Sequence, residues 1–409
     1  MVTIIDSEPA TGVFVGIDWG GSHHQVCVVD DAGTIRAQHT VEHTVPGHHV
    51  LDELLQQCRT SGPVRVAIER AEGVLVEHLL ARGERVYCIS PKISARARER
   101  YRLANTKSDA FDAFVLADTL RHEHAHWRPL SKASPETAAI AAMCRDRERF
   151  VVMQRAVESR LRATLEAYHP APLHLFSSLD RDITLAFIRD YPNPDAARRV
   201  GEDRMRRFCA RHGYSGRVEP AVLVQRLHPH LLTGAEGTVT GKQATALMLV
   251  DQLDLLNQHL RRFDHTLRPL VAGHPDGPLF TSFPGIGTVI AATMIGEMGD
   301  DRARFPSAPA LLAEAGLAPV TRASGRTRHV RFRYAANKRL RHSIDWWMIV
   351  AAREDPWSSS VYDGYRAAGQ GRYRAYRGLG ARWTRILWRA WTNHEPFDPQ
   401  RVHHLPPTP

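Results

Sequence analysis

The stretch "VGIDWGGSHHQVCVVD", Val15 to Asp30, joins two apolar runs through an aspartate and two glycines. Each run has the residue types of a buried strand, and the glycines between them indicate a turn. Asp18 therefore lies where a strand leaves the core. The position of this carboxylate at the end of a strand raises the question of what it binds.

The N-terminal 125 residues alternate between strand-like and helix-like segments. Three strands come first, and then helices and strands take turns until a long final helix. The predicted strands are 13–17, 25–29, 35–39, "VRVAIE" and "RVYCIS", and the final helix is Ser108 to Arg121. This order is that of the ribonuclease H-like fold, an α/β class in which the later strands are parallel. In that fold the first and fourth strands are neighbours.

Four carboxylates occupy positions where this fold would gather them. Asp18 ends the first strand, Glu69 ends the fourth, and Asp109 and Asp112 share one face of the final helix. Clustered acids require cations, so we expect Mg²⁺ or Mn²⁺, and a pair of such ions can assist phosphodiester cleavage. Separate roles remain open for these acids: a turn at Asp18, a Glu69 pair with Arg70 and a helix cap at Asp109.

The middle of the chain contains two long helical patterns with an irregular, proline-rich insert between them. The first covers Thr137 to Tyr168, and in the second Leu249, Leu253, Leu256 and Leu260 follow the 3.5-residue repeat of a coiled-coil seam. The two helices could pair within one chain as bundle helices, or the seam could join two chains. The sequence leaves both arrangements open.

The third block begins near "LFTSFPGIGTVIAATMIGEMGD" and is predicted to be mainly helical. Pro284, Gly285 and Gly287 predict a tight hairpin before an apolar helix, Thr288 to Met298, as in a helix-hairpin-helix element. Because glycine has no Cβ, Gly285 and Gly287 would let backbone N–H groups approach a phosphate. With 409 residues the chain is long enough for several domains, and we place them at 10–128, 129–272 and 273–397.

The net charge of +10 is concentrated in the third block. Residues 278–393 contain 18 Lys and Arg against 8 Asp and Glu, a surplus equal to that of the whole chain. Phosphate is the expected partner, although a solvated basic surface would have the same composition. Arg372, Arg374 and Arg377 alternate with tyrosines and are predicted to contact RNA or distorted DNA. Four tryptophans are predicted core residues: Trp346, Trp347, Trp383 and Trp388.

Several other classes of protein are disfavoured. The five cysteines lie far apart without a CxxC pair, and the tract "RHEHAHW" lacks the HExxH spacing, so neither disulfides nor a zinc site is expected. The chain has no apolar run of membrane-spanning length and no visible export signal. A cytoplasmic, nucleoid-associated protein is the expectation.

A set of motifs recurs in order across the chain: "GIDWG", "VAIER", "KSDAFDA", "FPGIGTVIAATMIGEMGD", "GLAPVTRASG" and "NKRLRHSI". Over about residues 12 to 395 the sequence closely resembles the bacterial DEDD-type transposases of the insertion-sequence family numbered one hundred and ten. The resemblance implies a RuvC-like N-terminal domain, a coiled-coil middle and a C-terminal transposase domain with a serine nucleophile. It also implies excision as a circle and guidance by a bridge RNA encoded by the element.

Under this resemblance the carboxylates are the metal ligands and Ser324 is the nucleophile. Ser324 precedes Gly325 in a tight turn, and three arginines flank it: Arg322, Arg326 and Arg328. A serine must be activated by a base or a metal before it attacks phosphorus. No histidine base is obvious apart from His329, so we expect metal at the acidic cluster to activate Ser324. Without the resemblance, an ordinary Ser-Gly turn would be the preferred interpretation of Ser324. Further predicted nucleic-acid contacts are Lys338, Arg339 and Arg341.

The favoured function is therefore a Mg²⁺-dependent, RNA-guided DNA recombinase that forms a covalent phosphoserine. Its partners would be the double-stranded DNA of element ends and target, a structured guide RNA, and further copies of the chain in a dimer or tetramer. A RuvC-like two-metal nuclease that resolves branched DNA is the alternative enzyme. A binding protein that has lost catalysis is the alternative outside enzymes.

Overall fold

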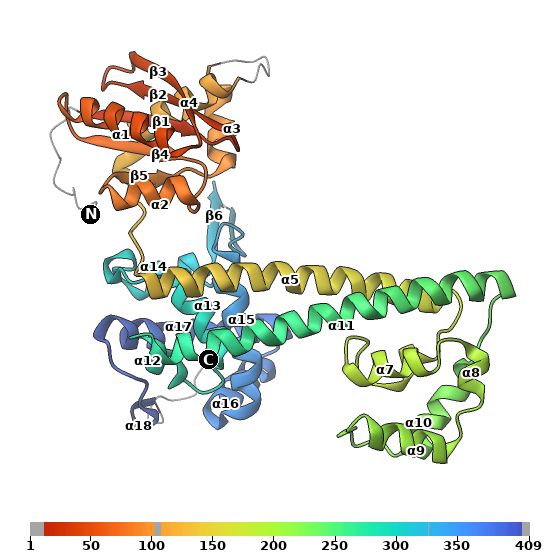
Figure 1. Ribbon diagram of the computed structural model, residues 1–409. Helices are drawn as coiled ribbons and strands as arrows, with labels where there is room; N and C mark the ends of the chain where they lie inside the picture. The colour runs from red at the N-terminus through yellow and green to blue at the C-terminus, as the bar shows by residue number, and fades with distance from the viewer. Residues whose placement is uncertain (1–11, 102–107, 326, 403–409) are drawn as a thin grey trace. The chain divides into compact units, whose positions relative to one another are not determined.

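A computed structural model describes residues 12–101, 108–325 and 327–402 (Figure 1). The chain divides into two compact units between Ala133 and Ser134. The first is a mixed α/β unit and the second is largely helical. This division agrees with an α/β N-terminal part followed by a helical remainder, as predicted.

A five-stranded sheet forms the centre of the first unit, in the order β3-β2-β1-β4-β5. β1 pairs antiparallel with β2 and parallel with β4, so the predicted neighbourhood of the first and fourth strands is confirmed. The strands are β1 (Val13–Asp18), β2 (His23–Val29), β3 (Ile35–Glu42), β4 (Val64–Ile68) and β5 (Arg85–Cys88). The helices are α1 (Val45–Arg59), α2 (Val74–Ala81), α3 (Pro91–Glu99) and α4 (Asp109–Glu123), followed by the 3₁₀ turn η1 (His124–His126).

Alternation of side chains along the strands gives the sheet two different faces. Val15 and Ile17 of β1 share a buried cluster with Leu51 of α1, whereas Phe14 shares another with Leu116 of α4. The helices α1 and α4 thus cover opposite faces of the sheet (Figure 1). The α4 face is the one toward which every even-numbered residue of β1 points.

Gly16 brings α4 unusually close to β1. A Cβ on Gly16 would lie 2.0 Å from the Ala113 carbonyl oxygen and 2.6 Å from the Ala117 nitrogen. Ala113 and Ala117 are themselves fully buried. Small residues on both elements therefore fix the N-terminal half of α4 against the carboxyl end of β1.

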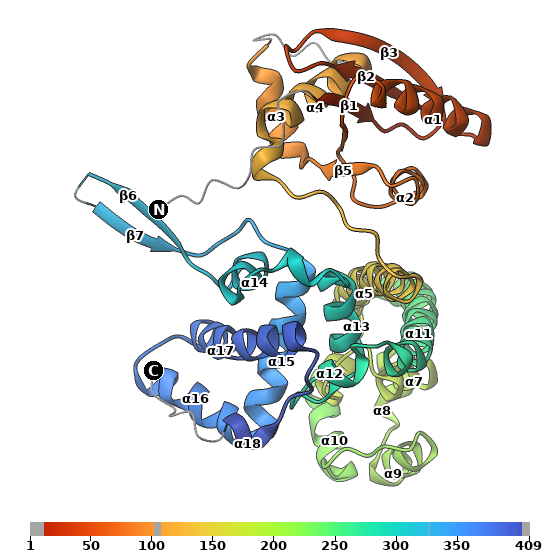
Figure 2. The same cartoon turned by 90° about the vertical axis from the view of Figure 1, so that its left-hand side faces the viewer.

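Two long antiparallel helices, α5 (Pro135–Glu166) and α11 (Glu236–Gly273), lie side by side in the second unit (Figures 1 and 2). Leu161 and Leu165 of α5 pack against Leu249 and Leu253 of α11, so the predicted leucine seam is buried within the chain. Ser134 caps α5 by accepting a hydrogen bond from the Thr137 backbone N–H.

The segment between these two helices is a helical insert with its own small core, in which Phe187 and Phe208 pack together. Its elements are α6 (Pro172–Leu175), α7 (Asp182–Asp190), α8 (Pro194–Arg198), α9 (Glu202–Arg211), α10 (Pro220–Leu227) and η2 (His228–His230). Prolines at or next to the first position begin several of them, because proline there loses no helical hydrogen bond.

The C-terminal part is a helical core around Trp347, Trp383 and Trp391, each at most 1 % exposed. Trp347 and Trp383 are confirmed as core residues, and Trp388 is half-buried. Trp346 was predicted to be buried but is 47 % exposed, because it lies one position round α15 from Trp347. The elements are α12 (Gly277–Thr281), α13 (Thr288–Met298), η3 (Arg302–Arg304), α14 (Ala308–Glu314), β6 (Val320–Ser324), β7 (Thr327–Arg331), α15 (Lys338–Glu354), α16 (Pro356–Ala367), α17 (Arg372–Asn393) and α18 (Pro399–Val402).

Candidate active site

Asp18 and Glu69 lie at the carboxyl ends of neighbouring parallel strands. Ile17 of β1 pairs with Ile68 of β4, so the two carboxylate residues follow at equivalent positions. Asp18 comes two residues after Gly16 and Glu69 two residues after Ala67, both of which face α4. Strand alternation therefore directs both carboxylates to the α4 side of the sheet.

Asp112 lies in the first turn of α4 and is 6 % exposed. The close approach of α4 to Gly16 brings this turn to the carboxyl end of β1. Asp109, one turn earlier on the same helix face, is exposed. Ser108 caps the helix by accepting a hydrogen bond from the Phe111 backbone N–H, and the helix dipole favours both carboxylates at this end.

Arg98 of α3 joins two of these acids. Its guanidinium is 2.8 Å from Asp112 Oδ1 and 3.9 Å from Glu69 Oε1. The hydroxyl of the buried Ser94, one turn earlier on α3, donates a hydrogen bond to Glu69. Arg70 is not the partner of Glu69, since it stacks over the Trp19 ring at 4.2 Å. Glu69 and Asp112 thus share one cation.

The donor set fits a hard divalent ion, because carboxylate oxygens are the ligands that Mg²⁺ and Mn²⁺ prefer. The guanidinium between Glu69 and Asp112 shows that the fold balances this negative charge with a cation. Among the described residues, however, no three acids have carboxylate oxygens that all lie within 4.8 Å of one another. The fold therefore brings Glu69 and Asp112 to one guanidinium without forming a closed metal site.

Gly20 and Gly21, which follow the first strand, differ in what they do. A Cβ on Gly20 would lie 2.3 Å from the His23 carbonyl oxygen, so the turn after Asp18 requires a glycine there. A Cβ on Gly21 would meet nothing within 4 Å. The turn predicted from these two glycines therefore depends on Gly20 and not on Gly21.

Ser324 is exposed at the end of β6, in a two-stranded hairpin that projects from the helices of the second unit (Figure 2). It pairs with Thr327, whose hydroxyl donates a 2.8 Å hydrogen bond to the Ser324 carbonyl oxygen. Gly325 has φ +53°, which favours glycine in this turn. Arg322 and Arg328 lie on the two strands, and Arg326 lies outside the described residues.

The other predicted nucleic-acid residues fall into two groups. Arg339 donates a 2.6 Å hydrogen bond to the buried Glu297, and Arg341 donates one of 2.6 Å to the Arg333 carbonyl oxygen. These guanidinium groups thus make contacts inside the unit. Exposed or partly exposed on the helix surfaces are Lys338, Arg372, Arg374 and Arg377.

The packing of the second unit requires a glycine at Gly285, and its predicted approach to a phosphate stays a prediction. A Cβ there would lie 2.8 Å from the Ala351 nitrogen of α15, and its φ is +79°. A Cβ on Gly287, at the N-terminus of α13, would meet nothing within 4 Å. Both glycines line a shallow pocket together with Arg268 and Thr288.

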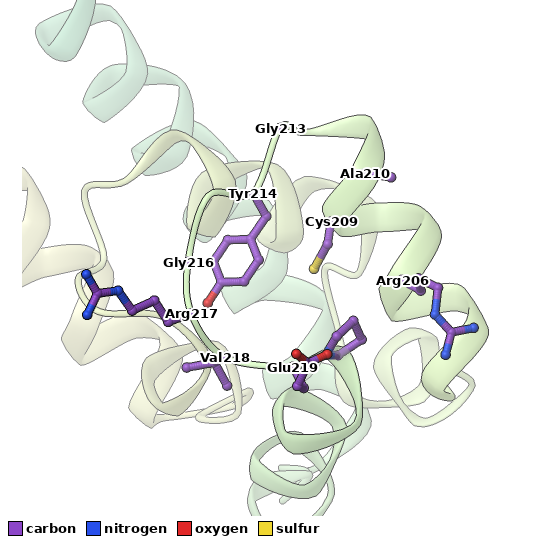
Figure 3. A pocket seen from close by; sticks show the side chains of 10 residues that line it. Arg206, Cys209, Ala210, Gly213, Tyr214, Gly216, Arg217, Val218 and Glu219 are labelled. Carbon is purple, nitrogen blue, oxygen red and sulfur yellow. The ribbon is translucent and has the colours of Figure 1, made fainter.

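A further pocket lies in the helical insert, where Arg206 and Arg217 stand on opposite sides of Tyr214 and Cys209 (Figure 3). It contains none of the residues that the sequence singled out. Cys209 is one of five cysteines, all of which are free thiols.

Sequence reasoning missed α3, and with it Ser94 and Arg98. A signal was present: Ser90 followed by Pro91 is a typical helix start, and the basic run after it has helical spacing. Gly16 was also missed, because a glycine inside an apolar strand carries no sign of the helix that will cross it.

Comparison with known proteins shows the family of the chain. A model of the DEDD transposases of IS110, described as a transposase, matches residues 15–170. A second, described as transposase of the IS116/IS110/IS902 family, matches residues 277–363. A protein assigned as the mini-circle transposase for IS117 of Streptomyces coelicolor is 34% identical, over 97% of each chain. The chain belongs to the IS110 family of transposases.

Other relatives of this IS110-family transposase cover nearly the same length. An uncharacterized 42 kDa protein of insertion element IS900 from Mycobacterium paratuberculosis is 27% identical over 95% of this chain and 98% of its own. A 43.6 kDa protein of IS110 from Streptomyces coelicolor is 24% identical over 90% of each chain. The chain is thus a DNA transposase, an enzyme that acts on DNA strands. Among its described residues, no helix has the length and apolar character needed to cross a membrane.

Proposed function

We propose that this transposase cleaves and rejoins DNA with Ser324 as nucleophile and with Mg²⁺ or Mn²⁺ held by Asp18, Glu69, Asp109 and Asp112. The observation that carries the proposal is the placement of Asp18 and Glu69 at the ends of paired parallel strands, on the face where α4 supplies Asp112. Arg98, which already neutralises two of these acids, supports a cation-binding role for the cluster.

Under this proposal the three parts of the chain have separate tasks. Residues 10–128 form a ribonuclease H-like domain of the RuvC type, which the strand order supports. Residues 129–272 form a helical domain built on the α5–α11 pair, and residues 273–397 carry the serine and a helix-hairpin-helix-like element. The family matches to residues 15–170 and 277–363 support the first and last of these assignments.

The cleavage step follows from the chemistry of a serine and a phosphodiester. The Ser324 hydroxyl gives up its proton, its oxygen bonds to phosphorus, and the bond from phosphorus to one deoxyribose oxygen breaks. A phosphoserine remains, and the departing DNA hydroxyl takes up a proton. Attack by the hydroxyl of another strand reverses these bonds and releases Ser324. When bound, Mg²⁺ would neutralise the charge that develops on the phosphate oxygens.

The partners follow from charge and from the relatives. The Lys and Arg surplus of residues 278–393 supports binding of duplex DNA and of a structured bridge RNA. The mini-circle in the name of the IS117 relative supports excision through a circular intermediate. Further copies of the chain, in a dimer or tetramer, would complete the assembly.

Covalent trapping on nicked DNA tests the nucleophile. Wild-type protein should form a protein–DNA adduct that survives denaturation, and Ser324→Ala should abolish the adduct while nucleic-acid binding persists. Thr321→Ala, which removes another exposed hydroxyl of β6, is the matched control and should retain the adduct. Recombination by Ser324→Ala would refute the assignment. An inactive Asp18→Asn beside a normal Ser324→Ala would favour the two-metal nuclease instead.

A further inference from the structure

A second group of metal-ligating side chains lies on the other face of the sheet. His24 is in β2, His43 follows β3, and His48 is in the first turn of α1. His24 lies opposite Val41, and Val41 belongs to the buried cluster that α1 covers. The sheet therefore separates these histidines from the carboxylates, which face α4.

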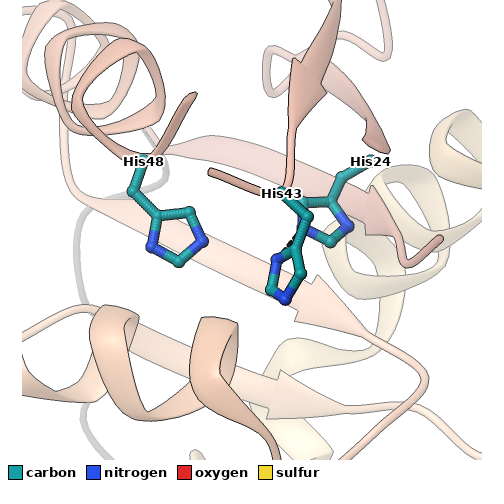
Figure 4. Close-up of side chains that lie close together, drawn as sticks. All are labelled: His24, His43 and His48. Atoms are coloured by element: carbon teal, nitrogen blue, oxygen red, sulfur yellow. Dashed lines mark hydrogen bonds between the residues drawn. The ribbon is translucent and has the colours of Figure 1, made fainter. Parts of the chain in front are cut away.

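One ring nitrogen from each of the three histidines lies within 4.8 Å of the other two (Figure 4). His24 Nε2 and His43 Nδ1 are 3.0 Å apart. Two ligands of a tetrahedral zinc ion are roughly 3.4 Å apart, given zinc–nitrogen bonds of about 2.0–2.1 Å. Small rotations of the rings would thus bring all three nitrogens around one ion.

His48 adds a second, independent observation. Its Nε2 atom is buried and has no hydrogen-bond partner among the described residues. A buried ring nitrogen without a partner is costly, and most such atoms in native proteins are satisfied. We propose that His24, His43 and His48 bind a transition-metal ion that prefers imidazole ligands, such as Zn²⁺.

The proton balance of binding is defined by two hydrogen bonds. The Gly20 backbone N–H donates to His24 Nδ1 at 3.3 Å, so the neutral His24 ring carries its proton on Nε2 and donates to His43 Nδ1. Coordination through Nε2 moves that proton to Nδ1. The long bond from Gly20 is lost, and metal–nitrogen bonds replace both contacts.

The surroundings suit an ion with three protein ligands. His24 is fully buried, whereas His43 and His48 are partly exposed, so an ion can enter from solvent and keep a water as its fourth ligand. The His78 ring lies 4.7 Å from the His48 ring, tilted by 44°, and hydrogen-bonds to Asp52 at 2.8 Å. Asp52 also pairs with Arg82 at 2.8 Å.

Protonation supports the same conclusion. Burial, followed by the charges of His43, His48 and His23, lowers the pKa of His24 to about 4. Burial, followed by the charges of His78 and His43, also lowers the pKa of His48. Both rings are therefore neutral at pH 7 and keep a lone pair for a metal.

Calorimetry on untagged, chelator-treated full-length protein tests this site. Zn²⁺ is titrated in the presence of saturating Mg²⁺, which occupies oxygen sites. We expect one tight zinc site per chain and a rise in Tm on zinc addition. His48→Asn should weaken zinc binding by more than the roughly 10–100-fold that loss of an outer partner costs, and should abolish the rise in Tm. His23→Asn, which alters the exposed neighbour of His24, is the matched control and should leave both unchanged.

Three results would overturn the proposal: no zinc binding by the wild type, wild-type affinity in His48→Asn, or loss of the zinc site in Asp18→Asn. Should His48→Asn fail to fold, Co²⁺ bound to the wild type provides the decision. An intense visible spectrum typical of tetrahedral nitrogen ligation supports the site, and a weak octahedral spectrum contradicts it. Ser324→Ala should bind zinc normally, so this test is independent of the transposition chemistry.

Discussion

Gly16 of β1 lies against the backbone of Ala113 of α4, so closely that a Cβ on Gly16 would stand 2.0 Å from the Ala113 carbonyl oxygen. An added Cβ could be accommodated only at a high cost in energy, because it would clash with helix backbone in a buried interface. This contact sets the distance between the strand that carries Asp18 and the helix that carries Asp112. The candidate site thus depends on a residue with no functional group.

Gly16→Ala should therefore weaken both the fold and the metal site. We expect a loss of about 3 kcal/mol or more in the free energy of unfolding, since overpacking against rigid backbone lies at the upper end of such costs. Mg²⁺ affinity should fall too, because α4 must move away from β1. Denaturant unfolding and calorimetry check the two effects. Gly21→Ala, where a Cβ meets nothing within 4 Å, should change stability by less than about 0.5 kcal/mol.

Arg98→Gln should change stability and Mg²⁺ affinity in opposite directions. The Asp112 carboxylate is buried and would lose its cationic partner, so the metal-free protein should lose roughly 3 kcal/mol. Mg²⁺ should bind about tenfold more tightly, since removing a neighbouring unit charge relieves a repulsion on a divalent ion of roughly 1–2 kcal/mol even in water. Calorimetry on Arg98→Gln and on the exposed control Arg96→Gln measures the affinities. Weaker Mg²⁺ binding in Arg98→Gln would mean that Arg98 supports the site instead of competing for it.

Much of the first unit follows from its sequence, because apolar alternation and turn residues are local signals. The strand order, and with it the neighbourhood of Asp18 and Glu69, could be predicted in this way. Side-chain contacts between distant segments outside this strand order could not. Arg98 lies between Glu69 and Asp112 only because α3 packs beside α4. The positions of His24, His43 and His48 in the chain match no recognisable metal-binding spacing. The "RHEHAHW" tract drew attention by its spacing, whereas the clustered histidines depend on strand pairing.

Stability below about pH 5 should depend on Glu297. Burial alone raises the pKa of this carboxyl, but hydrogen bonds from Arg339 and Asn337 and the charges of Arg339 and Arg145 outweigh it, so the pKa lies below its ordinary value of 4.5. A lowered folded-state pKa gives stability that is complete above the unfolded pKa and is lost as pH falls through the folded one. Glu297→Gln should cost about 3 kcal/mol at pH 7, since two arginines lose their partner, and should flatten the acid dependence. Thermal unfolding from pH 7 to 3 checks this, with the partly exposed Glu314→Gln as control.

Arg374 and Arg339 should separate binding from stability. Arg374 is exposed on α17, so Arg374→Ala should weaken DNA or RNA binding, lower the slope of log affinity against log salt by about 1, and leave Tm unchanged. Arg339 is held by Glu297, so Arg339→Ala should lower Tm, with a smaller effect on the salt slope. Salt titrations by fluorescence anisotropy measure both slopes. Arg198→Ala, an exposed arginine of the insert, is the control and should bind as the wild type does. An unchanged salt slope in Arg374→Ala would remove α17 from the nucleic-acid interface and leave the β6–β7 hairpin as the basic element to test next.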